Sequence, residues 1–313
     1  MNRARWRDQI VPPVVVLGTA LLLNAAIPTS LLGPATIAAG RAQPPAAAAC
    51  PPPSAIAAAV NRHDAAGRLP VTLDPVISTA GELTAQVLAM DTAAGLQAID
   101  LPAESFVGQP IGDLLVYTSH TPATGSVVHL VDLATGCDAV AVKPTHIVRS
   151  AVIAPDGSSI YAHSVTRASR RDNGVARFDL AGASSVVVPP LPESDAFGPT
   201  FGTLLRWSSD GAALAVQSCG FEACRTRILD VATGRIATFA PPGQGAFIAL
   251  TTHHLVTFAA CAGLPCDVLS TDLASGATAT LAGAAWSASS ADQADGNAIV
   301  TIETAAETTE VIQ

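Results

Sequence analysis

From about residue 71 to its end, the chain alternates short apolar runs with clusters of Gly, Pro, Asp and Ser. This pattern is typical of β-strands separated by tight turns. The clearest unit has four such runs, which we name strands a, b, c and d, at residues 204–207, 213–217, 226–229 and 235–239. Asp-Gly and Thr-Gly pairs between them supply the positive φ that hairpin turns need. The pattern predicts an all-β fold built from four-stranded units.

A turn that starts with aspartate and ends with glycine follows strand c in successive units, as in Asp132-Leu-Ala-Thr-Gly136. The aspartates of five such turns are 41, 47, 51 and 42 residues apart, which is the period of a propeller blade or a similar β-repeat. Dividing about 250 residues by roughly 42 per blade gives six blades, and five or seven fit the same length. We therefore predict a single β-propeller over residues 71–313. The repeated aspartates are expected to form turns; they are Asp91, Asp132, Asp179, Asp230 and Asp272.

The sixth unit ends before its strand d. Its strand a contains Trp286, its strand b covers residues 298–302, and the sequence ends within strand c at 310–313. A ring of blades is commonly closed by a strand from the other terminus, and residues 71–73 are the candidate for this strand.

Two segments between strands a and b resemble a known family. Ala154-Pro-Asp-Gly157 and Trp207-Ser-Ser-Asp-Gly211 are similar to the WD40-like repeats of TolB-type periplasmic propellers, as is the turn after strand c. The resemblance covers residues 85–300 as a repeat frame, and it implies a fold rather than a function because the repeat is structural. The fifth unit departs from it, with His253 and His254 where Asp-Gly is expected.

Composition and charge narrow the range of partners. Of 313 residues 49% are apolar and only 4% aromatic, so the strands are filled mainly by small and β-branched side chains that suit tightly stacked sheets. The formal net charge is −9, and without residues 1–43, which hold four arginines and one aspartate, it is −12. Lys143 is the only lysine. Nucleic-acid binding requires clustered basic residues, so we expect no nucleic-acid partner.

The first 43 residues have the pattern of a signal peptide or an N-terminal membrane anchor. Three arginines precede an uncharged stretch whose apolar centre, residues 14–27, is 14 residues long. That length fits a signal peptide and is short of the about 20 residues of a membrane-spanning helix. Residues 44–70 are rich in Pro and Ala and are predicted to form a linker, extended at least to residue 59. We expect an exported protein, either secreted, periplasmic or associated with the cell envelope, with membrane contact only through an uncleaved N-terminal segment.

The six cysteines agree with export. Cys219–Cys224 and Cys261–Cys266 each bracket a hairpin turn between strands b and c, where facing residues are close enough for a disulfide. Zinc binding is the alternative, but two pairs on different blades lie too far apart to share one metal. Cys50 and Cys137 remain, and we predict that they pair; lipidation of Cys50 is the alternative.

No catalytic motif is present: the sequence has no G-x-S-x-G, no H-E-x-x-H, no phosphate loop and no EF-hand loop. Lactonase-type propellers hold a metal with carboxylates and amides near strand a, and no matching set is found here. We expect His253 and His254 to lie in a solvated turn, and His120, His129 and His163 to be half-buried strand residues rather than ligands. The sequence predicts no cofactor and no metal.

Loop length is the remaining guide to function. The a–b and c–d turns are short and nearly identical. The b–c hairpins and d–a crossings vary in length and sequence, and the topology places these two loop sets together on one rim of the predicted ring of blades. Function is often carried by variable loops on a rigid scaffold. The sequence therefore favours a non-enzymatic binding or scaffold module for a protein or peptide-like ligand. An exported, metal-dependent, lactonase-type hydrolase with a site on the ring axis is the alternative, and a purely structural protein is the third. The candidate binding face contains Arg167, Arg170, Arg171, Glu193, Asp195, Phe197, Phe201, Phe221 and Glu222.

Overall fold

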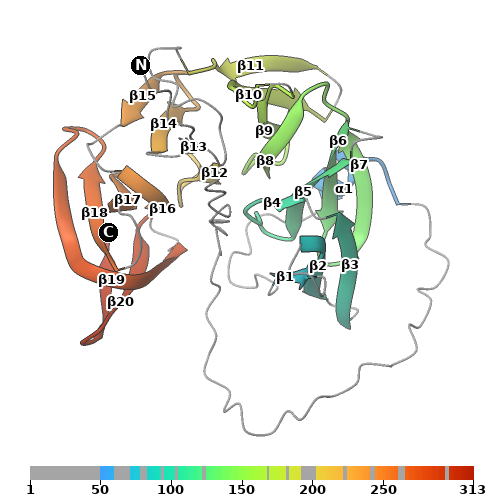
Figure 1. Ribbon diagram of the computed structural model, residues 1–313. Coiled ribbons are helices and arrows are strands. Elements are labelled where there is room, and N and C mark those ends of the chain that lie inside the picture. The colour runs from blue at the N-terminus through green and yellow to red at the C-terminus, as the bar shows by residue number, and fades with distance from the viewer. Residues whose placement is uncertain are drawn as a thin grey trace, which may run out of the picture.

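The structure is a computed structural model. It describes residues 50–59, 71–77, 83–92, 95–102, 105–121, 125–167, 169–180, 183–191, 202–220, 224–239, 244–259, 265–292 and 296–313. In these residues the chain forms one short helix, α1 (Pro53–Ala59), and the strands β1 to β21 (Figure 1). All the strand pairs in its sheets are antiparallel, as the alternation of apolar runs and turns predicted.

The strands form five sheets in the order of the sequence. The first sheet has three strands, β1 (Val71–Ile77), β2 (Leu83–Thr92) and β3 (Gly95–Pro102). Three four-stranded sheets follow. They are β4 (Phe106–Val107), β5 (Leu114–Thr121), β6 (Gly125–Asp132) and β7 (Cys137–Val142); then β8 (Ile147–Ile153), β9 (Ser159–Val165), β10 (Asp172–Asp179) and β11 (Ser184–Val188); then β12 (Gly202–Trp207), β13 (Ala213–Cys219), β14 (Cys224–Asp230) and β15 (Ile236–Phe239).

The last sheet has six strands and joins the fifth and sixth units of the sequence. It contains β16 (Gln244–Leu250), β17 (His254–Ala259), β18 (Cys266–Asp272), β19 (Thr278–Asp292), β20 (Ala298–Thr304) and β21 (Thr308–Ile312). The first part of β19 pairs with β18 and its second part with β20. Ala284, between the two parts, has a φ of 53°. The long strand thus serves as strand d of one unit and strand a of the next.

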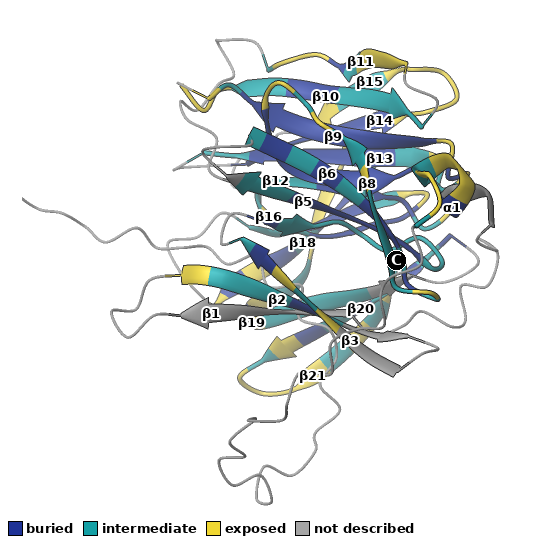
Figure 2. Cartoon of the chain, turned by 90° about the vertical axis from the view of Figure 1, so that its right-hand side faces the viewer, coloured by how far each residue is buried: buried dark blue, intermediate teal, exposed yellow. Residues whose placement is uncertain are grey.

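The sheets follow one another around a common centre (Figure 1). The first strands of neighbouring sheets contact each other, as β4 does with β8, β8 with β12, and β12 with β16. The core lies between the sheets, where their apolar faces meet. Val116 and Leu130 of the second sheet pack with Ile153 and Ile160 of the third, and Trp207 lies in the next layer. The strands β8 and β9 are buried along their whole length (Figure 2).

The predicted turn-forming role of the repeated aspartates is confirmed for three of them, Asp132, Asp230 and Asp272. The Asp132 carboxylate accepts a hydrogen bond from the Ala134 amide at 2.9 Å. Asp230 accepts one from Thr233 at 3.0 Å, and Asp272 one from Ser275 at 2.7 Å. Glycines with positive φ end these turns, which explains the Asp-to-Gly spacing. Asp179 differs, because its carboxylate pairs with the Arg177 guanidinium at 2.9 Å.

Two predictions for the N-terminal part were wrong. Residues 53–59 form the helix α1 instead of an extended linker, because Ile56, only 2% exposed, packs into the core beside β6 and β7. Residues 71–73 were expected to complete the sixth unit. They pair instead with residues 88–90 of β2 in the first sheet, where they add a strand to their own unit. Residues 1–43, predicted to be a signal peptide or anchor, lie outside the described residues.

Candidate binding face

The hairpin between β9 and β10 presents the three arginines of the predicted face. Thr166 donates its amide hydrogen to the Arg171 carbonyl oxygen at 3.0 Å, and Arg170 donates to the Thr166 carbonyl oxygen at 2.9 Å, which closes a tight loop. Arg167, Arg170 and Arg171 are all exposed. Arg170 has a φ of 52°, in the left-handed region that favours glycine or asparagine. The arginine-rich loop is thus ordered by its backbone, with its side chains in solvent.

A buried charged cluster lies directly beneath this hairpin. Asp172 follows the loop, and its carboxylate contacts the His163 Nε2 atom and, at 3.0 Å, an Arg227 guanidinium nitrogen. The side chains of His163, Asp172 and Arg227 are 0%, 4% and 4% exposed. Because Arg227 lies on β14, the cluster connects the third sheet to the fourth.

The same cluster fixes the start of the crossing from β11 to β12. The Leu191 amide donates to the Asp172 carboxylate at 2.7 Å, and the Arg227 guanidinium donates to the Pro189 carbonyl oxygen. One carboxylate and one guanidinium therefore hold a b–c hairpin and a d–a crossing together. The two loop types expected to share a rim meet at this point.

The environment of Asp172 favours its ionised form. Burial alone would raise the pKa of this carboxyl. The hydrogen bond and charge of His163, the charge of Arg227 and the Leu191 amide outweigh burial and lower the pKa to about 2. Ser218 lies 3.5 Å from the His163 Nε2 atom that Asp172 also contacts. In a Ser-His-Asp triad the serine and the carboxylate bind different ring nitrogens, so this arrangement is a structural ion cluster.

Sequence reasoning missed Asp172 and Arg227 and described His163 incorrectly. His163 was expected to be half-buried and is fully buried. The sequence holds no local signal for this contact, because Asp172 and Arg227 are 55 residues apart and lie on strands of different sheets.

Disulfides join the chain at points on both rims. The structure joins Cys219 to Cys224, with Cα atoms 4.0 Å apart, at the ends of β13 and β14. It also joins Cys50 to Cys137, as predicted, across 87 residues. Cys266 is disulfide-bonded. Its predicted partner, Cys261, lies outside the described residues, as do the face residues Glu193, Asp195, Phe197, Phe201, Phe221 and Glu222.

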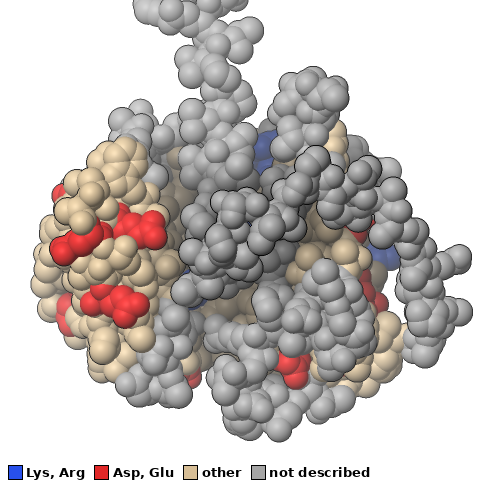
Figure 3. Space-filling model, turned by 90° about the horizontal axis from the view of Figure 1, so that it is seen from below, with Lys and Arg blue, Asp and Glu red and all other residues tan. Residues whose placement is uncertain are grey.

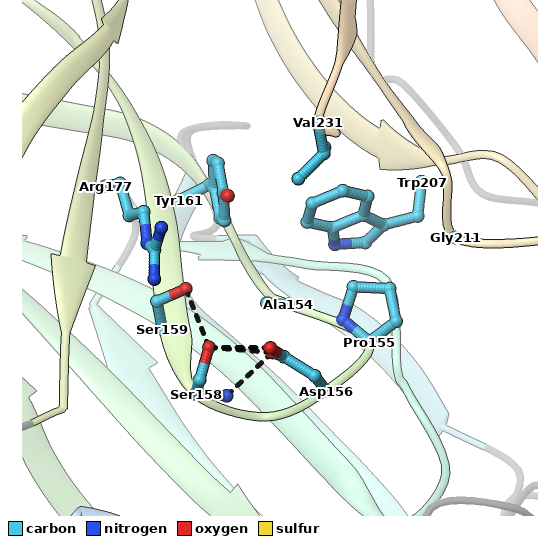
Figure 4. A pocket seen from close by; sticks show the side chains of 10 residues that line it. All are labelled: Ala154, Pro155, Asp156, Ser158, Ser159, Tyr161, Arg177, Trp207, Gly211 and Val231. Atoms are coloured by element: carbon cyan, nitrogen blue, oxygen red, sulfur yellow. Dashed lines mark hydrogen bonds between the residues drawn. The ribbon is translucent and has the colours of Figure 1, made fainter. Parts of the chain in front are cut away.

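A shallow pocket of about 220 Å³ lies on the opposite rim, where the a–b turns of the third and fourth sheets meet (Figure 4). Trp207 and Tyr161 form its aromatic wall, with ring centroids 5.1 Å apart in a T-shaped arrangement. The indole nitrogen of Trp207 donates to the Ile153 carbonyl oxygen at 2.7 Å. The pocket is smaller than the about 300–1,000 Å³ usual for small-molecule sites, and its Trp and Tyr rings are buried in the packing of two sheets. We interpret it as a seam between sheets.

The histidines do not form a metal centre in the part of the chain that the structure describes, where no group of three or more metal-binding side chains occurs. His129 stacks on Tyr117 and pairs with Asp138 at 3.0 Å, within the second sheet. Burial, followed by the hydrogen bond to Asp138, raises the pKa of Tyr117. His253 is exposed in its turn, as expected. The prediction was wrong for His254, which begins β17, is half-buried and lies 3.3 Å from the Ser270 hydroxyl.

The innermost strands of the third and fourth sheets carry arginines. The Arg149 guanidinium lies 5.6 Å from the centre of the Phe106 ring. That of Arg206 lies 5.8 Å from the Phe247 ring and 3.3 Å from the Ser290 hydroxyl of β19.

No protein-family model matches the chain, and no curated protein matches it in sequence. The solved structures that resemble it include TolB-type β-propellers. TolB from Acinetobacter baumannii is 16% identical with a TM-score of 0.47, over 77% of this chain and 62% of that one. A putative TolB from Agrobacterium tumefaciens is 10% identical with a TM-score of 0.48, over 76% and 80%. A prolyl endopeptidase is 15% identical with a TM-score of 0.46, over 84% and 45%.

The chain thus spans less than two thirds of the A. baumannii TolB and less than half of the endopeptidase. The disulfides of the chain bear on the compartment in which the protein resides. Disulfides are typical of oxidising compartments outside the cytoplasm, and two of them are present between described residues. None of the helical residues that the structure describes forms a segment with the length and apolar character needed to cross a membrane.

Proposed function

We propose that the chain is an exported, single β-propeller of six units. It would act as a binding or scaffold module for a protein or peptide-like ligand. The ligand would contact the rim formed by the b–c hairpins and d–a crossings, with Arg167, Arg170 and Arg171 at its centre. The rest of the candidate face, including Glu193, Phe197 and Phe221, would extend this surface.

The conformation of Arg170 is the observation that carries this proposal. Its φ of 52° is one that a side chain with a Cβ adopts at a cost of about 1–2 kcal/mol. The side chain is exposed, so burial does not offset this cost. Backbone strain that contributes nothing to folding is often associated with recognition sites. An arginine at this position therefore favours a role outside folding.

The anchoring beneath the hairpin supports the same function. The Asp172–Arg227 cluster and the Cys219–Cys224 disulfide restrict the loops before a ligand arrives. Loops that are already ordered lose less conformational entropy on binding. Guanidinium groups also bind carboxylates in a bidentate geometry, which suits an acidic side chain or chain terminus of a peptide.

The alternative is a lactonase-type hydrolase with a metal on the ring axis. Elemental analysis of the purified chain tests it directly: about one calcium or zinc per chain would favour the hydrolase and justify a screen of lactones and esters.

The binding proposal is tested by capture from the extracytoplasmic fraction of the source cells. The bait is the chain with Arg167→Ala, Arg170→Gly and Arg171→Ala, compared with the unsubstituted chain. Arg235→Ala is the matched control, because Arg235 is an exposed arginine on a c–d turn of the opposite rim. The triple variant should lose the captured protein and the control should retain it. Equal capture by the triple variant and by Arg235→Ala would eliminate this face as the binding site.

The strain at Arg170 is tested separately by a stability measurement. Arg170→Gly alone should keep the chain folded and raise its free energy of unfolding by about 0.5–1 kcal/mol.

A further inference from the structure

The unit formed by the last three strands, β19 to β21, has no fourth, outer strand among the residues that the structure describes. The second, third and fourth sheets each have a fourth, outer strand, namely β7, β11 and β15. In the fifth unit the first part of β19 has that position. The order β19-β20-β21 ends at β21, and no strand in the described residues pairs with its outer edge.

The hydrogen-bond register identifies the backbone groups on this edge. Ala298 and Gln313 exchange both of their backbone hydrogen bonds, at 2.9 and 3.0 Å. Hydrogen-bonded and non-hydrogen-bonded pairs alternate along an antiparallel ladder, so Val311 and Thr309 also face β20. The N–H and C=O groups of the alternate residues, Thr308, Glu310 and Ile312, therefore point outward. Their side chains are exposed as well.

Acidic side chains surround this edge. Glu303 on β20, Glu307 in the turn and Glu310 on β21 are all exposed. Figure 3 shows acidic side chains on the side of the molecule formed by the last sheet, at the left, with no basic side chain among them. Ile312 is 72% exposed at the end of the same strand. The edge thus combines backbone groups that no described strand pairs with, negative charge and one large apolar side chain.

We propose that the outer edge of β21 binds an extended segment of a partner protein that carries Lys or Arg at alternate positions. The segment would add the fourth strand to the last unit through main-chain hydrogen bonds to Thr308, Glu310 and Ile312. Its basic side chains would lie beside Glu303 and Glu310. Strand addition of this kind draws affinity from the backbone and specificity from alternate side chains. This surface is separate from the arginine hairpin and takes a ligand of opposite charge.

The charge pattern selects such a partner over a second copy of this chain. Antiparallel pairing of β21 with its own copy, in the register that uses all three outward residues, places Glu310 opposite Glu310. Like charges directly opposite each other destabilise a strand pair. A basic strand in the same position replaces this repulsion with attraction.

The probe is an eight-residue, end-blocked peptide in which Lys alternates with Val or Thr, and its control has Glu in place of Lys. Binding to the full chain is followed by fluorescence anisotropy at low ionic strength. We expect the Lys peptide to bind at least tenfold more tightly than the Glu peptide, and Glu310→Lys to weaken the Lys peptide by about fivefold or more. Equal affinities for the two peptides would overturn the charge argument.

Two variants of one residue separate backbone pairing from side-chain contact. Ile312→Pro removes an outward N–H and leaves the pairing with β20 intact, whereas Ile312→Ala keeps the N–H. The Pro variant should weaken the Lys peptide by about fivefold and the Ala variant by less than about twofold. Hydrogen exchange on the unsubstituted chain gives an independent readout. The amides of Thr308, Glu310 and Ile312 should become protected when the peptide binds. Unchanged exchange at these amides, or a dimer that forms through β21, would refute the proposal.

Discussion

The buried ion pair of Asp172 and Arg227 allows a quantitative test of how the binding face is supported. Asp172→Asn keeps the size of the side chain and removes its charge. The Arg227 guanidinium, 4% exposed, then remains buried without its anionic partner. Removal of one member of a buried ion pair costs about 3–5 kcal/mol. We expect a loss of that size in the free energy of unfolding, measured by urea denaturation with the disulfides intact.

The pH dependence gives a second estimate of the same interaction. The pKa of Asp172 is about 2 in the folded chain, against 3.8 for an ordinary aspartate side chain. The difference is worth about 2 kcal/mol. Because the folded pKa is lower than the unfolded one, this contribution is fully present above about pH 4 and is lost as the pH falls toward 2. Asp172→Asn should lack this part of the acid destabilisation.

The control is an ion pair on the same strand. Arg177 and Asp179 are 40% and 39% exposed, so Asp179→Asn should cost less than about 1 kcal/mol. In the double variant Asp172→Asn/Arg227→Met, the unpaired charge is gone, and at least half of the loss should be recovered. If Asp172→Asn costs no more than Asp179→Asn, or if the two losses simply add in the double variant, the cluster does not support the rim in the way described here.

Two further predictions concern the scaffold. Replacing Cys50 and Cys137 by Ser should lower the free energy of unfolding by about 4–5 kcal/mol, and replacing Cys219 and Cys224 should lower it by about 2 kcal/mol. The difference arises because the first disulfide closes a loop of 87 residues and the second a loop of 5. Equal losses in urea denaturation would contradict this prediction. Gly108→Ala should cost about 3 kcal/mol or more, because a Cβ there would lie 2.1 Å from the Ala151 carbonyl oxygen. Gly234→Ala is the control, because Gly234 has a φ of 69° and no atom lies within 4 Å of the added Cβ. It should cost about 1 kcal/mol. Similar melting temperatures for the two variants would refute the packing between the second and third sheets.

The strands and turns were predictable because their signals are local. An aspartate that binds the amides of its own turn, or an alternating run such as 213–217, carries its conformation within a few residues. The helix α1 was not predictable in this way. Its Pro- and Ala-rich sequence resembles a linker, and its position depends on one apolar side chain, Ile56, and on the Cys50 disulfide. Residues 71–73 have the apolar pattern of a strand, but that pattern does not say which sheet they join.

The candidate face was predictable only in its exposed part. The arginine hairpin stands out in the sequence because three basic residues occur close together in a chain of net charge −9. The cluster beneath it depends on Asp172 and Arg227, which are 55 residues apart and meet only when two sheets stack. A single sequence contains no local signal for that contact.

The positions of the arginine hairpin and of the acidic β21 edge follow from which parts of each sheet are exposed to solvent. In the middle of the ring both faces of a sheet are covered, as the fully buried strands β8 and β9 show, so charges there must be paired, as in the cluster at Asp172. Exposed charges are left for loop tips and for uncovered edges. The arginine hairpin is such a tip, and β21 with Glu310 is such an edge. Because these surfaces differ in sign and lie on different sheets, we propose that one chain could hold a basic and an acidic ligand at once. Two separate surfaces of this kind would suit the proposed scaffold function better than an enzyme with a single axial site.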